Sequence, residues 1–258
     1  MDHHEVLRLF DRQMRREVAP DHPGVRVERT GTVVRQSGGA GDWNGVVFSD
    51  LDESTADAEI AAQVRHFGAL GVEFEWKTYR HDRPADLGER LTRAGFVADE
   101  PESLMIAEVA GQAEPVALPD GLRLVDATDE AGFALAAEVH EQAFGTDASR
   151  LHGQLLDRLA HDPDTFVMTL ALAGDRPVSA ARVEFAPGKD FAGLWGGGTV
   201  AEYRGRGLYR ALVAHRAALA AARGVHYLQV DALPTSRPIL ERLGFTQLSV
   251  TTPYIWKP

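Results

Sequence analysis

The chain has 258 residues, 44% of them hydrophobic, and a formal net charge of -11 at pH 7, so it can build a core and is not wholly disordered. The acidic balance argues against nucleic acid as the main partner, because phosphate binding needs a basic face, and it suits a cationic acceptor such as an amine. The absence of cysteine excludes disulfides, thiolate–zinc sites and an acyl-cysteine intermediate. No apolar run approaches the roughly 20 residues that cross a bilayer, and the first residues lack the features of a signal peptide, so we expect a cytoplasmic protein without a membrane partner.

In the N-terminal part, hydrophobic spacing and turn residues predict an alternation of strands and helices. One helix is expected to start at Ser54 or Thr55, which can cap it, and to end at Gly71, with Ile60, Val64, Phe67 and Leu70 on its inner face. The other expected elements are a helix over 6–14, strands over 25–30, 31–35, 43–48 and 72–77, a helix over 84–91 followed by Gly95-Phe96, and a strand over 103–109.

The segment 111–120 contains Pro and Gly and predicts a linker. A strand at 122–125, helices over 133–144 and 151–159, and a hairpin of strands 165–173 and 177–185 are expected next. The apolar strand 191–195 runs into Gly196, Gly197 and Gly198, which suggests a bulge or a close backbone approach. The remaining elements are a helix over 208–223, a strand over 225–230, a helix over 237–243, Gly244-Phe245 and a last strand.

The stretch 198–209 predicts a strand end, a turn and a helix start, with Gly205 and Gly207 flanked by Arg204 and Arg206. Glycines let the backbone approach a ligand, and the first N–H groups of a helix are unpaired and lie at the positive end of its dipole. Such a turn is suited to a pyrophosphate. The pattern matches neither the Walker sequence nor the dinucleotide fingerprint Gly-x-Gly-x-x-Gly.

The segment 200–207, the helix after it and the segment 240–245 together resemble the GNAT acetyltransferase superfamily, whose signature Q/R-x-x-G-x-G/A falls on 204–209. The resemblance covers about 121–258 and implies that acetyl-CoA is the co-substrate, that a small-molecule amine is the acceptor, and that two parallel strands splay near the three glycines to admit the pantetheine arm. It implies cofactor contacts from the backbone N–H groups of Gly198, Thr199, Val200, Arg204, Gly205, Arg206, Gly207, Leu208 and Tyr209.

The order of strands, helix, strand, short helix, Gly-Phe and strand occurs twice along the chain. This looks like a tandem GNAT architecture of mixed α/β class, in which each domain has a central, mixed, mostly antiparallel twisted sheet flanked by helices. The expected domains are 1–110 and 121–258. The first copy has the acidic segment 50–53 before its helix, which repels a pyrophosphate, so we expect this copy only to pack against the second. The protein is expected to be a monomer or a homodimer.

Direct acyl transfer needs a neutral amine, but a lysine-like amine, with a pKa of about 10.4, is mostly protonated near neutral pH. A base that deprotonates the amine and an acid that protonates the departing thiolate are therefore required. Glu184 is the first candidate base, but it can also be a polar residue on an exposed face. Asp231 is the second, and it can instead cap the following turn. Leu240 stands where many family members have the Tyr that protonates the thiolate, and Tyr209 stands where they have Gly or Ala. Tyr209 and Tyr203 are the candidate acids, although Tyr203 can instead be a packing residue of the loop, and the thiolate can also leave without a dedicated acid.

Two other hypotheses differ in class from an enzyme. A coenzyme A or acyl-CoA sensor without turnover is compatible with Tyr209, Leu240 and a degenerate first copy. An RNA-binding Arg-Gly segment fits poorly, because the segment is short and lies in an acidic chain. The ten histidines are scattered without ligand spacing, so no metal site is expected.

Overall fold

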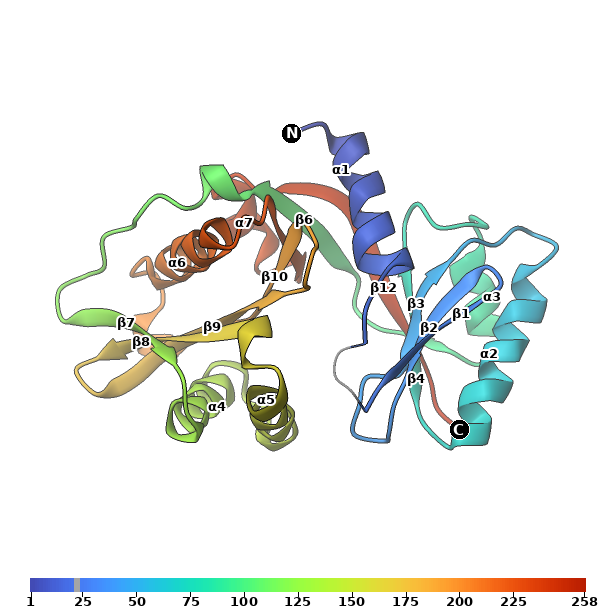
Figure 1. The fold of residues 1–258 in the computed structure, drawn as a ribbon, viewed down its shortest axis with the longest axis horizontal. Coiled ribbons are helices and arrows are strands. Elements are labelled where there is room, and N and C mark those ends of the chain that lie inside the picture. Colours follow the sequence, from blue (N-terminus) through green and yellow to red (C-terminus); the bar gives the residue numbers. More distant parts are fainter. Residues whose placement is uncertain (21–23) are drawn as a thin grey trace. The chain divides into compact units, whose positions relative to one another are not determined.

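The structure is a computed structural model that describes residues 1–20 and 24–258 (Figure 1). By its contacts the chain divides into two compact units. The first comprises Met1–Met105, Asp231–Glu241 and Thr246–Pro258, and the second comprises Ile106–Val230 and Arg242–Phe245. Within the described residues, no helix is long and apolar enough to cross a membrane.

The first unit begins with a helix that continues into a π-helical turn, and it then follows the predicted alternation. Its elements are α1 (His3–Phe10), the π-helical turn Asp11–Arg16, β1 (Arg26–Thr30), β2 (Val33–Ser37), β3 (Gly45–Ser49), α2 (Ala56–Leu70), β4 (Phe74–Tyr79), α3 (Leu87–Arg93), β5 (Val97–Ala98) and β12 (Thr246–Trp256). The strand β6 (Glu102–Glu108) begins here, and most of α7 (Arg237–Arg242) belongs here.

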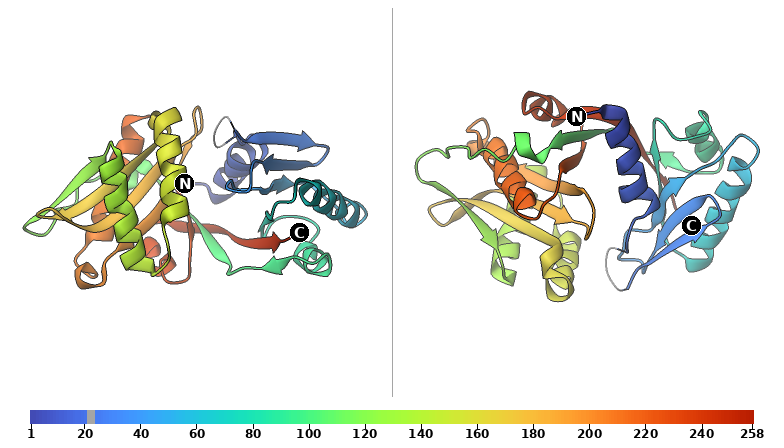
Figure 2. Two further views of the ribbon diagram at one scale, coloured as in Figure 1. Left: turned by 90° about the horizontal axis from the view of Figure 1, so that it is seen from below. Right: turned by 45° about the horizontal axis from the view of Figure 1, so that its top comes forward.

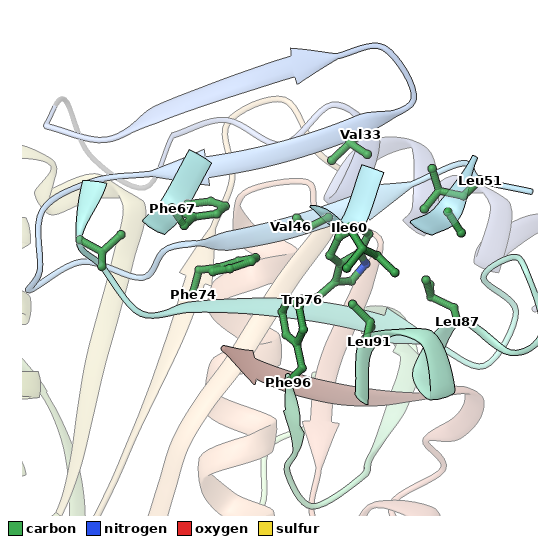
Figure 3. Packing of buried hydrophobic residues seen from close by; sticks show 12 residues of the cluster. Val33, Val46, Leu51, Ile60, Phe67, Phe74, Trp76, Leu87, Leu91 and Phe96 are labelled. Carbon is green, nitrogen blue, oxygen red and sulfur yellow. The ribbon is translucent and has the colours of Figure 1, made fainter. Parts of the chain in front are cut away.

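In this unit β1, β2 and β3 are antiparallel neighbours, β3 and β4 are parallel, and β4 pairs antiparallel with β12. Alternating residues of β4 point into a core in which Phe74 and Trp76 are almost completely buried (Figure 3). Helices α2 and α3 add Ile60, Phe67 and Leu91 to this core. The ring of Phe67 stacks on that of Phe74 at 4.2 Å between centroids, which joins helix to sheet.

Two local expectations about α2 need correction. Thr55 lies at the N-cap but makes no capping side-chain bond. Asp52 instead accepts from the backbone N–H groups of Ser54 and Thr55, because a carboxylate one turn earlier reaches both donors. Leu70 was expected on the inner face but is 50% exposed, since it lies in the last turn, where the chain leaves the core at Gly71.

The second unit holds the remaining strands and helices. Its elements are β7 (Leu122–Ala127), α4 (Glu130–Phe144), α5 (Ser149–His161), β8 (Phe166–Ala173), β9 (Arg176–Phe185), β10 (Phe191–Thr199), α6 (Leu208–Ala222) and β11 (Tyr227–Ala232), with short 3-10 turns at Val109–Gly111, Pro163–Thr165 and Ala201–Tyr203. The strands lie in the order β11-β10-β9-β8-β7, and every neighbouring pair is antiparallel except β10 with β11.

Helices cover both faces of this second sheet. Figure 1 shows α6 on one face and α4 with α5 on the other, and Figure 2 shows α4 and α5 side by side. Phe133 and Leu155 from these two helices pack against Phe166 and Met168 of β8, whereas Leu208 of α6 packs in a separate cluster on the sheet. The predicted fold class is confirmed, since the fold is mixed α/β and the strands of each unit pair mostly antiparallel, with helices beside them.

The predicted repeat of elements is also present, but the last strand is placed differently from the expected domain 121–258. β12, which follows the second Gly-Phe pair, has its contacts in the first unit, where it pairs with β4 over Thr251–Trp256. The spacing of residues along β12 predicts a strand but says nothing of its partner, because the pairing of a strand depends on residues far away in the chain.

Candidate functional site

The strands β10 and β11 form a parallel ladder of only three residue pairs, which ends at Gly193 opposite Gln229. Further along β10, the register with β9 shifts between Trp195 and Gly198. Gly196 has a φ of +60°, which favours glycine. The predicted bulge is therefore present, and β10 beyond Gly193 has an edge that β11 does not pair.

The turn between β10 and α6 is open to a ligand. Gly205 and Gly207 have φ values of +74° and +82°, and no other heavy atom lies within 4 Å of a Cβ built on either of them. Helix α6 begins at Leu208, with Gly207 as its N-cap and no capping side chain. The first N–H groups of α6 therefore have no partner inside the helix, and they lie at the positive end of its dipole.

Some of the expected cofactor contacts are already used within the protein. The N–H of Val200 donates to the carbonyl of Val178, and that of Arg204 donates to Ala201. The guanidinium of Arg204 donates to the carbonyls of Thr199 and Ala143, both at 3.0 Å. This corrects the expectation that the N–H groups of Val200 and Arg204 hold the cofactor, because bonded donors are not available to a ligand.

Gly205, Arg206, Gly207, Leu208 and Tyr209 remain as candidate contacts. The guanidinium of Arg206 lies 4.7 Å above the ring of Tyr203, at an exposed position. Gly198 and Thr199 are in the ladder with β9, and Ser179 donates its hydroxyl proton to the Gly198 carbonyl at 2.6 Å. The open glycines, the helix start and the exposed arginine fit a pyrophosphate.

Aromatic rings from both layers of helices lie against the glycines of β10. A Cβ on Gly197 would lie 3.2 Å from the ring of Tyr209, and one on Gly198 would lie 2.9 Å from the ring of Phe144. Phe144 is 49% exposed, and nothing in its local sequence distinguishes it from other helical phenylalanines. Burial raises the pKa of the Tyr209 hydroxyl above its ordinary value, so Tyr209 is protonated at neutral pH.

Glu184 on β9 is held by two arginines. Its Oε1 accepts from Nε of Arg182 at 2.6 Å, and its Oε2 lies 3.0 Å from Nη1 of Arg158. Burial by itself would raise the pKa of Glu184, but the two guanidinium groups outweigh it and hold the pKa below its usual value. The pairing makes Glu184 a weaker base than an unpaired buried carboxylate.

Asp231 on β11 counts with the first unit, where its Oδ2 accepts from the ammonium of Lys77 at 2.5 Å. Its side chain is 3% exposed, and within the described residues its Oδ1 has no hydrogen-bond partner. Burial and the nearby charge of Asp231 raise the pKa of Glu102 to about 7. Asp231 thus lies in a buried charged cluster and does not act as a simple turn cap.

Residues 130–245 match the family model described as Acetyltransferase (GNAT) family. This stretch is a GNAT acetyltransferase domain. It contains the turn, α6 and the Gly244-Phe245 pair on which the resemblance depended. No curated protein matches the chain.

Solved structures extend the similarity in fold to the whole chain. A GCN5-related N-acetyltransferase from Kribbella flavida is 17% identical with a TM-score of 0.69, over 99% of this chain and 94% of that one. A tandem GNAT protein from the clavulanic acid biosynthesis pathway is 14% identical with a TM-score of 0.63, over 93% and 85%. An acetyltransferase of the GNAT family from Novosphingobium aromaticivorans is 19% identical with a TM-score of 0.55, over 90% and 91%. These likenesses show a fold shared with tandem GNAT proteins.

By the resemblance described above, Leu240 is expected to take the place at which many GNAT proteins have the tyrosine that supplies a proton. Leu240 is completely buried and carries no proton donor. Within the described residues, no group of three or more histidines and carboxylates is arranged to hold a metal ion.

The corresponding strands of the first unit, β3 and β4, also pair in parallel only briefly, at Gly45 and Val46. The next carbonyl, that of Val47, accepts from Nε of Arg15 at 3.2 Å. The Arg15 guanidinium also bonds Asp11 at 2.8 Å and Asp82 at 2.7 Å and lies 4.1 Å above the ring of Tyr79. In the first unit, a buried arginine thus occupies the place where the strands part.

Proposed function

We propose that this protein is an N-acetyltransferase that transfers the acetyl group of acetyl-CoA directly to the amine of a small molecule, with the cofactor bound by the second unit. The observation that carries the proposal is the unpaired edge of β10 leading to the open turn at Gly205 and Gly207 and the start of α6. Acetyl-CoA supplies an activated thioester, and this chain supplies the anion site and the groups that move protons.

Tyr209 is the proposed proton donor for the departing thiolate. Its raised pKa keeps the phenol protonated, and its ring lies beside the bulge of β10. Glu184 and Asp231 remain the candidate bases. The two arginines on Glu184 lower its proton affinity, and Oδ1 of Asp231 has no hydrogen-bond partner among the described residues.

Isothermal calorimetry of acetyl-CoA into the wild type and Gly207→Asp tests the cofactor site. The added carboxylate faces the pyrophosphate and should abolish binding. Gly174→Asp is the matched control, because Gly174 also has a positive φ of +60° and open space around a Cβ, in the hairpin between β8 and β9. Unchanged affinity in Gly207→Asp would refute the assignment.

The same titration tests the proposal that the first unit binds no acyl-CoA. Its turn carries Asp50, Asp52 and Glu53 around a cavity of ≈ 540 Å³, and Arg15 fills the gap between its strands. The expected stoichiometry is one acetyl-CoA for each chain. A second site that survives Gly207→Asp would show that the first unit binds too.

A non-catalytic acyl-CoA sensor is the second candidate, favoured by the buried Leu240 at the usual acid position. An assay of free thiol release with a panel of amines separates the two. Turnover that depends on the amine excludes the sensor, whereas tight binding with no turnover over the whole panel supports it.

A further inference from the structure

A narrow cavity lies between α4, α5 and the sheet of the second unit and reaches the bulge of β10. Its volume is ≈ 30 Å³, room for one or two water molecules. Its wall is mainly apolar, but His140, His152, Arg182 and Gly196 also line it. The Nε2 atom of His152 is buried and has no hydrogen-bond partner among the described residues, so this polar atom is unsatisfied unless the cavity holds a polar group.

The guanidinium of Arg182 has unused donors at this cavity. Within the described part of the chain, the guanidinium of Arg182 makes one hydrogen bond, from Nε to Glu184. Its Nη1 would lie 3.1 Å from a Cβ on Gly196, so the Nη edge lies beside the bulge. The Arg182 side chain is 16% exposed, and an arginine so enclosed usually presents its fork to a carboxylate or a phosphate.

The charges around Arg182 do not balance. Arg158 and Arg182 share the single carboxylate of Glu184, and the other nitrogens of Arg158 donate to Thr165. On the opposite face of the sheet, the buried Arg216 donates to the carbonyl of Arg182 at 3.0 Å, and burial lowers the pKa of Arg216 to about 10. Two arginines on one carboxylate, with Arg216 across the sheet, leave positive charge in excess, in a chain whose net charge is -11.

We propose that Arg182 recognises a carboxylate of the substrate at the bulge of β10, with its Nη edge, and that the cavity takes a small polar group attached near that carboxylate, within reach of His152. The proposal rests on the proposed acetyltransferase function and names its substrate class. The carboxylate belongs either to the amine, as in an amino acid, or to the acyl group, as in a dicarboxylic acyl-CoA. A guanidinium fork makes two charge-assisted bonds to either.

Matched pairs of substrates distinguish these two sources. The first pair is serine and ethanolamine with acetyl-CoA, measured by thiol release. The second is succinyl-CoA and butyryl-CoA, measured by calorimetry without any amine. The wild type should favour the carboxylate partner in one of the two pairs by about tenfold or more.

Arg182→Gln should remove this preference, measured as the ratio between the two partners of a pair, because any effect of the variant on Glu184 enters both partners alike. Arg158→Gln is the matched control, because it breaks the same cluster on Glu184 but keeps the free edge of Arg182, and it should retain the preference. Gly196→Ala is a second variant that keeps every charge and pushes a Cβ against Nη1, and it should weaken the preference in the same direction.

The outcomes separate the inference from the function on which it rests. Binding of acetyl-CoA and turnover of amines without a carboxylate preference in either pair would overturn the inference and leave the acetyltransferase standing. A preference that persists in Arg182→Gln would also overturn it. No binding of any acyl-CoA to the wild type would overturn both.

Discussion

The ring of Tyr209 at the start of α6 lies against Gly197 of β10, so closely that a Cβ on Gly197 would be 3.2 Å from its Cε2 atom. By the resemblance to GNAT proteins, Tyr209 is expected to stand at the position where they have Gly or Ala. The missing side chain of Gly197 makes the room that this larger residue needs. Tyr209 and Gly197 therefore form a complementary pair at the edge along which we expect the cofactor to lie.

The first prediction concerns the hydroxyl of Tyr209. Tyr209→Phe keeps the ring against Gly197 and removes the proton that burial holds on the phenol. If Tyr209 protonates the thiolate, kcat should fall by about a hundredfold while the KM for acetyl-CoA stays within about threefold. Tyr203→Phe is the control, since Tyr203 packs under Arg206 and should change neither constant. A kcat of Tyr209→Phe equal to the wild-type value would exclude the phenol as the acid.

A second prediction concerns Arg15, which is 2% exposed and pairs with Asp11 and Asp82. Arg15→Met leaves a buried carboxylate without its partner, so we expect a loss of about 3–5 kcal/mol in the free energy of unfolding. Arg16→Ala is the control, because Arg16 is more than half exposed and reaches Asp50 only at 3.4 Å; it should cost less than about 1 kcal/mol. Urea unfolding measures both, and equal losses would contradict a special role for Arg15.

A third prediction concerns the pH dependence of stability through Glu102, whose pKa is raised by burial, and by the nearby charge of Asp231, to about 7. Because this value lies above that of the unfolded chain, the stability linked to Glu102 is complete below about pH 4.5 and is lost as the pH rises through about 7. Glu102→Gln should therefore be more stable than the wild type at about pH 8, by on the order of 1 kcal/mol, and equally stable at about pH 4.

Urea midpoints at these two pH values measure the effect of Glu102→Gln. A useful control is Glu241→Gln, because Glu241 is about half exposed and pairs with Arg237 on the surface of α7. The control should show no such difference between the two pH values. A Glu102→Gln variant that is less stable than the wild type at about pH 8 would contradict the environment described for Glu102.

A fourth prediction concerns Asp126 on β7, whose Oδ1 lies 2.9 Å from Nε2 of His215 and accepts from the hydroxyl of Thr169 at 2.7 Å. Burial by itself would raise the pKa of Asp126, but the bonds from His215 and Thr169 outweigh it and hold the pKa below the ordinary value. The stability that the Asp126 carboxylate contributes is thus present at pH values above its pKa in the unfolded chain. It is lost as the pH falls through the lower pKa that Asp126 has in the folded protein.

Asp126→Asn should cost about 1 kcal/mol at neutral pH, a figure reduced because the side chain is about one-third exposed. The cost should disappear in acid, where the wild-type carboxylate is protonated as well. Thermal unfolding at neutral and at low pH measures it. A cost that is the same at both pH values would show that the carboxylate charge is not what stabilises the wild type.

Much of the GNAT domain could be predicted from the sequence, because the signals involved are local. The glycines before residue 208 predict a turn, and the apolar period of 208–222 predicts a helix. The Gly-Phe pair further on marks the end of the next short helix, so each signal lies within a short stretch of chain. The glycines at 196–198 likewise indicate a bulge, since few other residues adopt that backbone.

Only the tertiary structure decided which distant groups meet. Glu184 looks like a free carboxylate in the sequence, and its arginine partners lie two and twenty-six positions away, on β9 and α5. Arg15 meets the carbonyl of Val47, and β12 pairs with β4, across still longer separations. Local periodicity predicts which face of a helix or strand a residue occupies. Ion pairs, strand partners and pKa values depend on contacts that form only when the whole chain folds.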